Sequence, residues 1–302
     1  MDTNNLGFIQ AARSRPITAC RSELCSERLT RGQRQARDEG RSRLRGNAQT
    51  SSGITPRLQV QLWLTTEGRL EGPGQEGMEM SEYVTLKAAD GHELSAYVAR
   101  PESVPVAGLV VVQEIFGVNA HIRSVTDGYA KDGFLVVAPA LFDRIERGVQ
   151  LGYDGADMQK AMSFVLKLDP TKALADIAAA IEFAGSATGK KTGVIGYCFG
   201  GSMAWLAATR LHPAAAVGYY AGRIGNYVGE KPSAPVMLHF GKQDTHIPAE
   251  EVEKVHAAHP EVEIYWYDAG HGFNCDARSS YNEEAAHAAR ERSLRFLKKH
   301  LA

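Results

Sequence analysis

A cysteine lies between glycines where the chain turns from a predicted strand into a predicted helix. The strand, residues 192–195, ends in apolar residues, and Gly196-Tyr197-Cys198-Phe199-Gly200-Gly201 follows it. Small, helix-compatible residues occupy positions 202–209. So sharp a turn strains the cysteine backbone and leaves no room for side chains on either side. It also places Cys198 at a helix N-terminus, where free N–H groups favour a thiolate, and so predicts a nucleophile.

So short a pattern is equally compatible with a buried structural cysteine, and later residues decide between the two interpretations. Asp244 comes after a predicted strand at 236–240, and His271 after another at 262–267. In a parallel sheet both would lie on loops at the edge where ligands bind. His271 would take or hold the thiol proton, and Asp244 would accept a hydrogen bond from the imidazole. Nucleophile, acid and histidine in this order are typical of the α/β-hydrolase fold.

Each assignment has an alternative. Asp244 could instead cap the helix that follows it. Asp268 is a second candidate acid, but it lies three residues before His271 on the same turn and would have difficulty facing the ring. His246 is a second candidate base, although its position near a helix start favours exposure. Since His271 lies between glycines, core packing does not explain it, and we predict that it acts with Cys198 and Asp244.

Alternating strands and helices predict the layers that position these residues. An Asp-Gly turn at 90–91 joins 83–86 to 94–98 as an antiparallel hairpin. The apolar run at 108–112 is typical of a strand covered on both faces. From there the alternation predicts an α/β fold, a mostly parallel sheet with helices on both faces. The other predicted strands are 134–138, 192–195, 214–220, 236–240 and 262–267, and the helices are 121–131, 157–168, 171–184, 202–209, 248–258 and 282–300.

The composition limits the class of protein. The chain has 302 residues, enough for a large single core, and no apolar run near the roughly 18 to 20 residues of a membrane span. A net charge of −1 gives no reason to expect nucleic acid or membranes as partners. Four cysteines without a tight framework indicate a reducing compartment, and we predict a cytoplasmic location. We expect a small-molecule substrate and a monomer or small homo-oligomer.

Residues 1–77 differ from the rest of the chain. They hold 12 Arg, no Lys and 8 acidic residues, a net charge of +4, whereas the remaining 225 residues are net −5. A disordered basic tail, a targeting segment, and upstream sequence translated from a start codon placed too early are the three interpretations. We favour the early start, with Met78 or Met80 as the natural beginning. Residues 78–302 are predicted to form one domain, and 1–77 to be disordered and not catalytic.

An acidic residue follows the strand 108–112, where a hydrolase would stabilise an oxyanion. The segment is Gln113-Glu114-Ile115-Phe116-Gly117. A carboxylate there would repel both a thiolate and an oxyanion. The alternative, a surface glutamate, is disfavoured by the apolar neighbours Ile115 and Phe116. We therefore expect Glu114 to take part in the chemistry.

Taken together, these features resemble the dienelactone hydrolases, or carboxymethylenebutenolidases. The resemblance covers residues 82–297. It implies hydrolysis of small lactones or esters, of the dienelactone-to-maleylacetate type, through a cysteine thioester and without cofactor or metal. The motifs that carry it are QEIFGVN at 113–119, GYCFGG at 196–201, GYY at 218–220, the turn at 241–244 and AGHGF at 269–273.

The resemblance also implies residue roles beyond the Cys–His–Asp triad. Glu114 would take the proton of a neutral resting Cys198 thiol when substrate arrives. Backbone N–H groups of Ile115 and Phe199 would form the oxyanion hole. Tyr219 matches a tyrosine that the family has near its active site.

The residues that would bind a substrate carboxylate match those of the family only in part. Arg144 matches the first of two family arginines, with a solvated loop arginine as the alternative. Cys275 occupies the position of the second family arginine. Either Arg278 takes the role of that arginine, or the substrate differs from that of the family. Cys275 and His271 alone would be a metal pair, and no further ligand cluster in the sequence supports a metal site.

Two other functions are compatible with the sequence. The first is a thioesterase or carboxylesterase of the same fold. The second, from another class, is a non-catalytic binding protein with a hydrolase fold. The intact set of Cys198, His271 and Asp244 argues against the second, since drift would be expected to erase at least one member.

Overall fold

The computed structural model describes residues 80–302, so the predictions for residues 1–77 lie outside the described residues. Strands and helices alternate from the third strand onward, as expected. In chain order the elements are β1 (Ser81–Lys87), β2 (Glu93–Ala99), β3 (Ala107–Val112), α1 (Ala120–Lys131), β4 (Phe134–Pro139), the 3₁₀ helix η1 (Leu141–Arg144), α2 (Gly155–Lys167), α3 (Pro170–Thr188), β5 (Thr192–Tyr197), α4 (Phe199–Arg210), β6 (Ala216–Tyr219), the 3₁₀ helix η2 (Ile224–Tyr227), β7 (Val236–Gly241), α5 (Ala249–Ala258), β8 (Glu263–Tyr267) and α6 (Glu283–Leu301).

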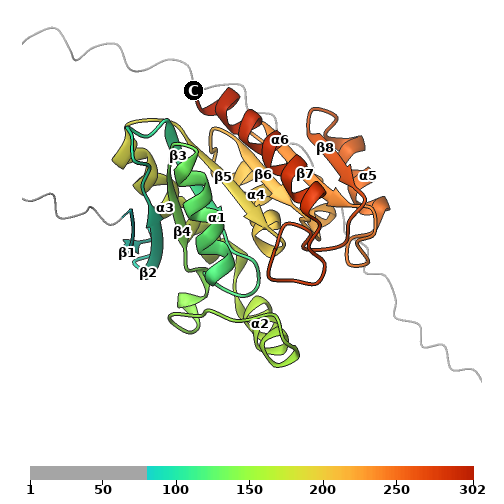
Figure 1. The fold of residues 1–302 in the computed structure, drawn as a ribbon, viewed down its shortest axis with the longest axis horizontal. Coiled ribbons are helices and arrows are strands. Elements are labelled where there is room, and N and C mark those ends of the chain that lie inside the picture. Colours follow the sequence, from blue (N-terminus) through green and yellow to red (C-terminus); the bar gives the residue numbers. More distant parts are fainter. Residues whose placement is uncertain (1–79) are drawn as a thin grey trace, which may run out of the picture. The chain divides into compact units, whose positions relative to one another are not determined.

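All eight strands belong to one sheet with the order β1-β2-β4-β3-β5-β6-β7-β8 (Figure 1). The β1–β2 hairpin is antiparallel, and β2 pairs antiparallel with β4. Every later pair is parallel. The predicted α/β fold with an antiparallel N-terminal hairpin is therefore confirmed.

Element ends follow local signals that the apolar pattern alone did not resolve. Helix α3 extends further than predicted at its C-terminal end, to Thr188. Asp169 caps its start by accepting a hydrogen bond from the Thr171 N–H at 2.8 Å, and Pro170 is its first residue. Gly189 ends it in the left-handed conformation, with φ of 64°.

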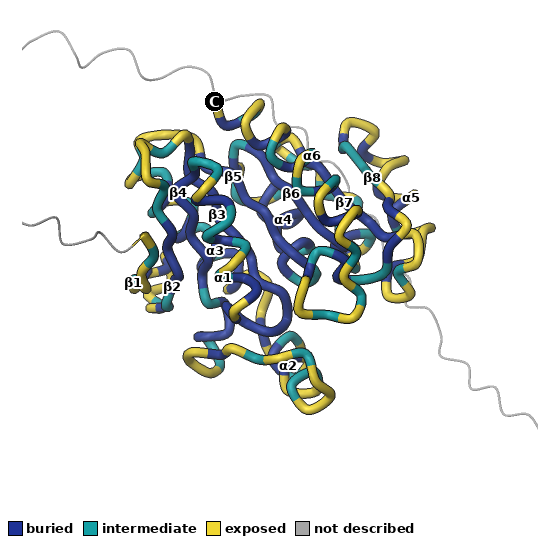
Figure 2. Tube along the Cα trace, viewed as in Figure 1, coloured by how far each residue is buried: buried dark blue, intermediate teal, exposed yellow. Residues whose placement is uncertain are grey.

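Helices cover both faces of the sheet. In Figure 1, α1 and α6 lie in front of the strands, and α3 and α4 pack behind them. Every residue of β3, β4, β5, β6 and β7 is buried, and Figure 2 shows these strands as the interior of the domain. Within residues 80–302, no helix combines the length and apolar character needed to cross a membrane.

The order of the strands determines where a site can form. Strand β3 has β4 on one side and β5 on the other. The chain leaves β3 through α1 to reach β4, then returns past β3 through α2 and α3 to reach β5. The loops after β3 and β5 therefore run in opposite directions, and this leaves room for ligands at the carboxyl ends of these two strands. Glu114 follows β3 and Cys198 follows β5, so the fold brings both to this point.

A buried polar network joins α6 to the sheet. The ring of His239 in β7 lies between two hydroxyl groups, with Nδ1 2.9 Å from Tyr267 Oη and Nε2 3.0 Å from Ser293 Oγ. Tyr219 Oη is 2.8 Å from the same Ser293 Oγ. Burial, reinforced by the charge of Arg292, lowers the pKa of His239 to about 3. The imidazole is therefore neutral and serves as a structural hydrogen-bonding group.

We expect His239 to make the stability depend on pH. Below about pH 6.5 the unfolded chain binds a proton at this histidine that the folded protein does not bind until about pH 3. The free energy of unfolding should therefore fall as the pH is lowered, by about 1.4 kcal/mol per pH unit from this group. Urea unfolding at about pH 6.5, 5.5 and 4.5 measures this dependence. His239→Gln should have a shallower slope by that amount, and identical slopes would contradict the assignment.

Candidate active site

The turn between β5 and α4 holds Cys198 in a strained conformation. Its φ is 54°, a region that residues other than glycine rarely adopt, and its N–H donates to the Tyr219 carbonyl at 3.0 Å. A Cβ on Gly196 would collide with the carbonyl oxygen of Gly200. A Cβ on Gly200 would lie 2.5 Å from the Gln113 carbonyl oxygen. The glycines predicted to flank the nucleophile are therefore required by backbone contacts.

The structure brings the predicted Cys–His–Asp set together. Cys198 Sγ lies 3.2 Å from His271 Nε2, and His271 Nδ1 lies 2.7 Å from Asp244 Oδ2. The Asp244 side chain is 1% exposed and that of His271 is 13% exposed. The second Asp244 oxygen accepts the backbone N–H of His246 at 2.8 Å. Asp244 therefore orders its own turn with one oxygen and orients the imidazole with the other.

The alternative acid and base lie apart from this chain of contacts. Asp268 is mostly exposed and pairs with Lys242 at 3.0 Å. The side chain of His246 is 71% exposed, and its Nδ1 is 3.6 Å from the outer oxygen of Asp244. Helix α5 takes no side-chain cap, so Asp244 does not cap it. Geometry thus favours His271 and Asp244 over both rivals.

Charge stabilises the histidine in its protonated form. Burial by itself lowers the pKa of His271, but its hydrogen bonds to Asp244 and Cys198 outweigh burial and raise the pKa to about 10. Burial likewise opposes the charged form of Asp244, yet the hydrogen bond from His271 holds that pKa below its ordinary value. The sulfur of Cys198 therefore lies beside an imidazolium that can later give up a proton during the reaction.

Glu114 is a buried carboxylate with few partners. The residue is 1% exposed, and its Oε1 accepts a hydrogen bond from Tyr220 Oη at 3.3 Å. Its Oε2 is buried and has no hydrogen-bond partner among residues 80–302. Gln113 fixes the loop, because its side chain accepts from the Leu141 N–H at 3.1 Å and donates to the Glu114 carbonyl at 3.3 Å. The position predicted to be chemically important is thus held rigidly in the interior.

The remainder of the QEIFGVN motif builds the loop around Glu114. Gly117 has φ of 80°, and a Cβ there would collide with the Val149 carbonyl. Asn119 caps α1 by accepting the Ile122 N–H at 3.2 Å, while its Nδ2 donates to Tyr153 Oη at 3.1 Å. Each polar or glycine position of the motif therefore has a local structural cause.

Two backbone amides are available near the nucleophile. Phe199 is the first residue of α4, and the amide of a first helical residue has no acceptor within its helix. The Ile115 N–H lies in the loop after β3 and donates no hydrogen bond to another described residue. These amides come from the two loops that diverge at the carboxyl ends of β3 and β5, as an oxyanion hole requires.

Tyr219, predicted to lie near the site, touches Cys198 through its backbone carbonyl, and the tyrosine hydroxyl next to Glu114 belongs to Tyr220. Tyr219 is fully buried and points its hydroxyl at Ser293, away from Glu114. Tyr220 donates to Glu114, and its ring centroid lies 5.1 Å from that of His271. Successive residues leaving a strand point to opposite sides, so the alternation of the GYY motif was the signal that could have separated the two.

Arg144, predicted to bind a substrate carboxylate, is occupied by two aspartates. Its Nε and Nη2 each lie 2.7 Å from the Asp176 carboxylate, and its Nη1 lies 2.8 Å from Asp90. Asp176 is fully buried, so Arg144 compensates an interior charge. A substrate carboxylate would have to displace one of these partners to bind Arg144.

Arg278 lies next to the loop that carries His271. A Cβ on Gly272, the neighbour of His271, would lie 2.5 Å from Arg278 Nη1. The guanidinium stacks over the rings of Phe116 and Tyr153 at 5.9 and 5.8 Å. It forms no ion pair with any residue between 80 and 302. Unlike Arg144, it carries a positive charge that is available to a ligand.

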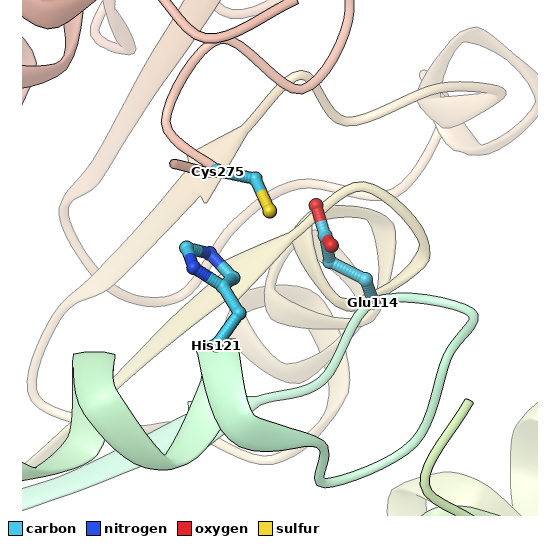
Figure 3. Close-up of side chains that lie close together, drawn as sticks. All are labelled: Glu114, His121 and Cys275. Atoms are coloured by element: carbon cyan, nitrogen blue, oxygen red, sulfur yellow. The ribbon is translucent and has the colours of Figure 1, made fainter. Parts of the chain in front are cut away.

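Cys275 lies beside two residues that the sequence did not connect with it. Figure 3 shows its side chain approaching those of Glu114 and His121. The residue is fully buried, and burial, reinforced by the charge of Glu114, raises the pKa of its thiol to about 11. No sequence signal pointed to His121, which sits in the first turn of α1. The sequence offered only His271 as a possible metal-binding neighbour of Cys275, whereas the structure places Glu114 and His121 beside it.

A Cys–His–Asp chain at the carboxyl edge of a mostly parallel sheet defines the α/β-hydrolase class. Solved structures of that class are similar to this chain. A putative dienelactone hydrolase from Klebsiella pneumoniae superposes with a TM-score of 0.63 at 29% identity, covering 71% of this chain and 96% of its own. An esterase from Pyrococcus furiosus shares the fold at 17% identity, with a TM-score of 0.56 over 74% of this chain and 93% of its own.

Sequence relatives narrow the class to a family. The family model described as "Dienelactone hydrolase family" matches residues 94–301. The carboxymethylenebutenolidase of Pseudomonas putida is 33% identical over 72% of this chain and 96% of its own length. A putative carboxymethylenebutenolidase of Yersinia pestis is 36% identical over 72% and 87%. The chain belongs to the dienelactone hydrolase family, and it is a carboxylic ester hydrolase.

We expect Asp244→Asn to lower the pKa of His271. The substitution removes the negative charge that counteracts burial, so the pKa should fall by at least about 2 units. NMR titration of ¹⁵N-labelled imidazoles measures it. His246→Gln is the matched control, because it removes the exposed neighbour and keeps the backbone N–H that Asp244 accepts. An unchanged His271 pKa in Asp244→Asn would show that the short contact does not set its protonation.

Proposed function

We propose that the chain hydrolyses small lactones or esters of the dienelactone type by covalent catalysis at Cys198. The observation that carries this proposal is the contact of Cys198 Sγ with His271 Nε2 at 3.2 Å, backed by Asp244 at 2.7 Å. The P. putida relative is named carboxymethylenebutenolidase, and its match extends over 96% of its own length. Both support a lactone as substrate.

Catalysis proceeds in two steps. The thiolate of Cys198 attacks the lactone carbonyl carbon, and the N–H groups of Ile115 and Phe199 stabilise the resulting oxyanion. The ring C–O bond then breaks, the ring oxygen leaves as an enolate that takes a proton from the His271 imidazolium, and a thioester remains on Cys198. Water attacks the thioester while the now neutral His271 takes its proton, the carboxylic acid leaves, and Glu114 returns its proton to the Cys198 thiolate.

Glu114 takes the proton of the Cys198 thiol when substrate binds. In the resting enzyme the charge of Glu114 opposes a thiolate nearby, and once the carboxylate has accepted the proton that opposition is removed. Burial, reinforced by the charge of Glu114, keeps the pKa of Tyr220 well above its ordinary value. The hydroxyl therefore stays protonated and continues to donate to Glu114, which holds the carboxylate in position.

Substrate selection rests on Arg278. Its charge is free of acidic partners among the described residues and lies beside the loop of His271. A carboxylate on the lactone would pair with Arg278, which takes the place of the family arginine that is absent at Cys275.

We place the enzyme in the cytoplasm as a monomer or small homo-oligomer, with no nucleic acid or membrane partner.

Cys198→Ala tests the covalent mechanism. Hydrolysis of a dienelactone and of p-nitrophenyl acetate should fall by at least about 10³-fold, because no other group in the site can form the thioester. Circular dichroism and thermal unfolding verify that the variant folds. Residual activity within tenfold of the parent would rule out Cys198 as the nucleophile, and loss of activity on the lactone alone would also contradict the proposal.

Arg278→Gln tests carboxylate recognition. Loss of a charge-assisted hydrogen bond of about 1.5–3 kcal/mol predicts a roughly 10- to 100-fold higher KM for a carboxylate-bearing dienelactone. The KM for neutral p-nitrophenyl acetate should change less than about threefold, since that ester has no carboxylate. Steady-state kinetics on both substrates separate the two effects.

Arg144→Gln is the matched control for this experiment. It leaves the buried Asp176 without its partner, so it should lower the stability by about 3–5 kcal/mol and affect both substrates alike. Selective loss of the lactone in Arg144→Gln, with Arg278→Gln unaffected, would reverse the assignment of the two arginines. Equal activity on both substrates in every variant would favour a carboxylesterase.

A further inference from the structure

Three buried side chains with metal-binding atoms meet beside the candidate active site. They are Glu114 from the loop after β3, His121 from the first turn of α1, and Cys275 from the loop after β8 (Figure 3). One ligand atom from each, a carboxylate oxygen, an imidazole nitrogen and a sulfur, lies within 4.8 Å of the other two. The residues are 1%, 7% and 0% exposed. Two neighbouring segments and a third that is distant in the chain therefore present a compact set of O, N and S donors.

Two of these donors lack any partner. Glu114 Oε2 and His121 Nε2 are both buried without a hydrogen bond in the described part of the chain. Buried polar atoms are almost always paired, because burial removes the water that would otherwise solvate them. Two buried polar atoms without partners, on residues whose ligand atoms gather with the sulfur of Cys275, indicate that a further group belongs there.

The other ring nitrogen of His121 has a carboxylate partner, which leaves the lone pair of Nε2 free to bind that group. Its Nδ1 lies 3.2 Å from Asp276 Oδ1. A carboxylate on one ring nitrogen holds the proton there and leaves the lone pair on the other, which is how metal-binding imidazoles are commonly oriented. His121 thus has a partner for its N–H and none for its lone pair.

The donor set selects the chemical class of ligand. Ca²⁺ and Mg²⁺ prefer all-oxygen sites, whereas Zn²⁺ accepts thiolate, imidazole and carboxylate together. Ligand atoms of a tetrahedral zinc site lie about 3.3–3.8 Å apart, so the three side chains need to close by at most about 1.5 Å. Three protein ligands leave a fourth position for water. A buried water could pair with Glu114 and His121, but a thiol is only a weak hydrogen-bond partner for it, whereas a thiolate is a strong ligand of zinc.

We propose that Glu114, His121 and Cys275 bind one Zn²⁺ or a similar thiophilic divalent cation, and that this cation inhibits hydrolysis. On binding, the Cys275 thiol releases its proton to solvent, and sulfur, nitrogen and oxygen each donate an electron pair to the metal. The metal then holds the Glu114 carboxylate, which can no longer accept the proton of Cys198. The inhibition rests on the role proposed for Glu114, whereas the binding itself does not.

Co²⁺ titration of the full chain tests the binding without substrate. The parent for this experiment carries Cys20→Ser and Cys25→Ser, which removes the thiols outside the described residues. One equivalent of Co²⁺ should produce a thiolate-to-cobalt charge-transfer band, and one equivalent of Zn²⁺ should abolish it. Cys275→Ser should eliminate the band, and His121→Phe should weaken binding at least tenfold.

Two matched controls separate this site from the catalytic one. Asp244, His246 and His271 form a second group of candidate ligands, so His246→Gln must keep the band for the assignment to hold. Cys198→Ala must keep it as well, because Cys198 is the other described cysteine. A band that survives in Cys275→Ser, a band lost in Cys198→Ala, or the absence of saturable binding would overturn the proposal.

Inhibition is measured separately on p-nitrophenyl acetate. Zn²⁺ should reduce the hydrolysis rate of the parent reversibly, with recovery on adding a chelator. In Cys275→Ser the Zn²⁺ concentration for half-inhibition should rise at least tenfold. Stoichiometric Co²⁺ binding without Zn²⁺ inhibition would overturn the regulatory part and the proton-accepting role of Glu114, while the assignment of the metal ligands would stand.

Discussion

The strained turn at Cys198 is the constraint on which the rest of the site depends. Its positive φ is maintained because the backbones of Gly196 and Gly200 touch with no space for a side chain between them. Helix α4 therefore begins directly at the carboxyl end of β5, with its first amides next to sulfur. The loops that carry Asp244 and His271 have only to reach this one fixed point, and the parallel pairing of β6, β7 and β8 brings them there.

The site contains two buried carboxylates with opposite surroundings. Asp244 has an imidazolium at 2.7 Å, and this partner outweighs the cost of burial. Glu114 has only the neutral hydroxyl of Tyr220 within the described residues, together with one unpaired oxygen. A paired carboxylate orients a neighbour, whereas an unpaired one is ready to accept a proton or a cation. The proton-accepting and metal-binding roles proposed for Glu114 both follow from this difference.

Prediction from the sequence succeeded where the signal was local. Apolar runs and the Asp-Gly turn specified the strands and the hairpin, and residues just after strands were expected at one edge of the sheet. It gave no information where the partner of a side chain was distant. Arg144 was predicted to bind substrate, and the structure pairs it with Asp176 and Asp90, which lie 32 and 54 positions away. The match of Tyr219 to a motif could not reveal that Tyr220 reaches Glu114, because a motif records neighbours in the chain and not the side to which each one points.

The sequence by itself determined the α/β fold, the order of nucleophile, acid and histidine, and the unusual acid at Glu114. These follow from periodicity and from residues adjacent in the chain, which are properties of the sequence alone. Only the tertiary structure decided that Cys275 faces Glu114 and His121. That meeting depends on how the loops after β3 and β8 pack against the start of α1. Contacts between segments so far apart are set by strand order and side-chain packing, and no local pattern encodes them.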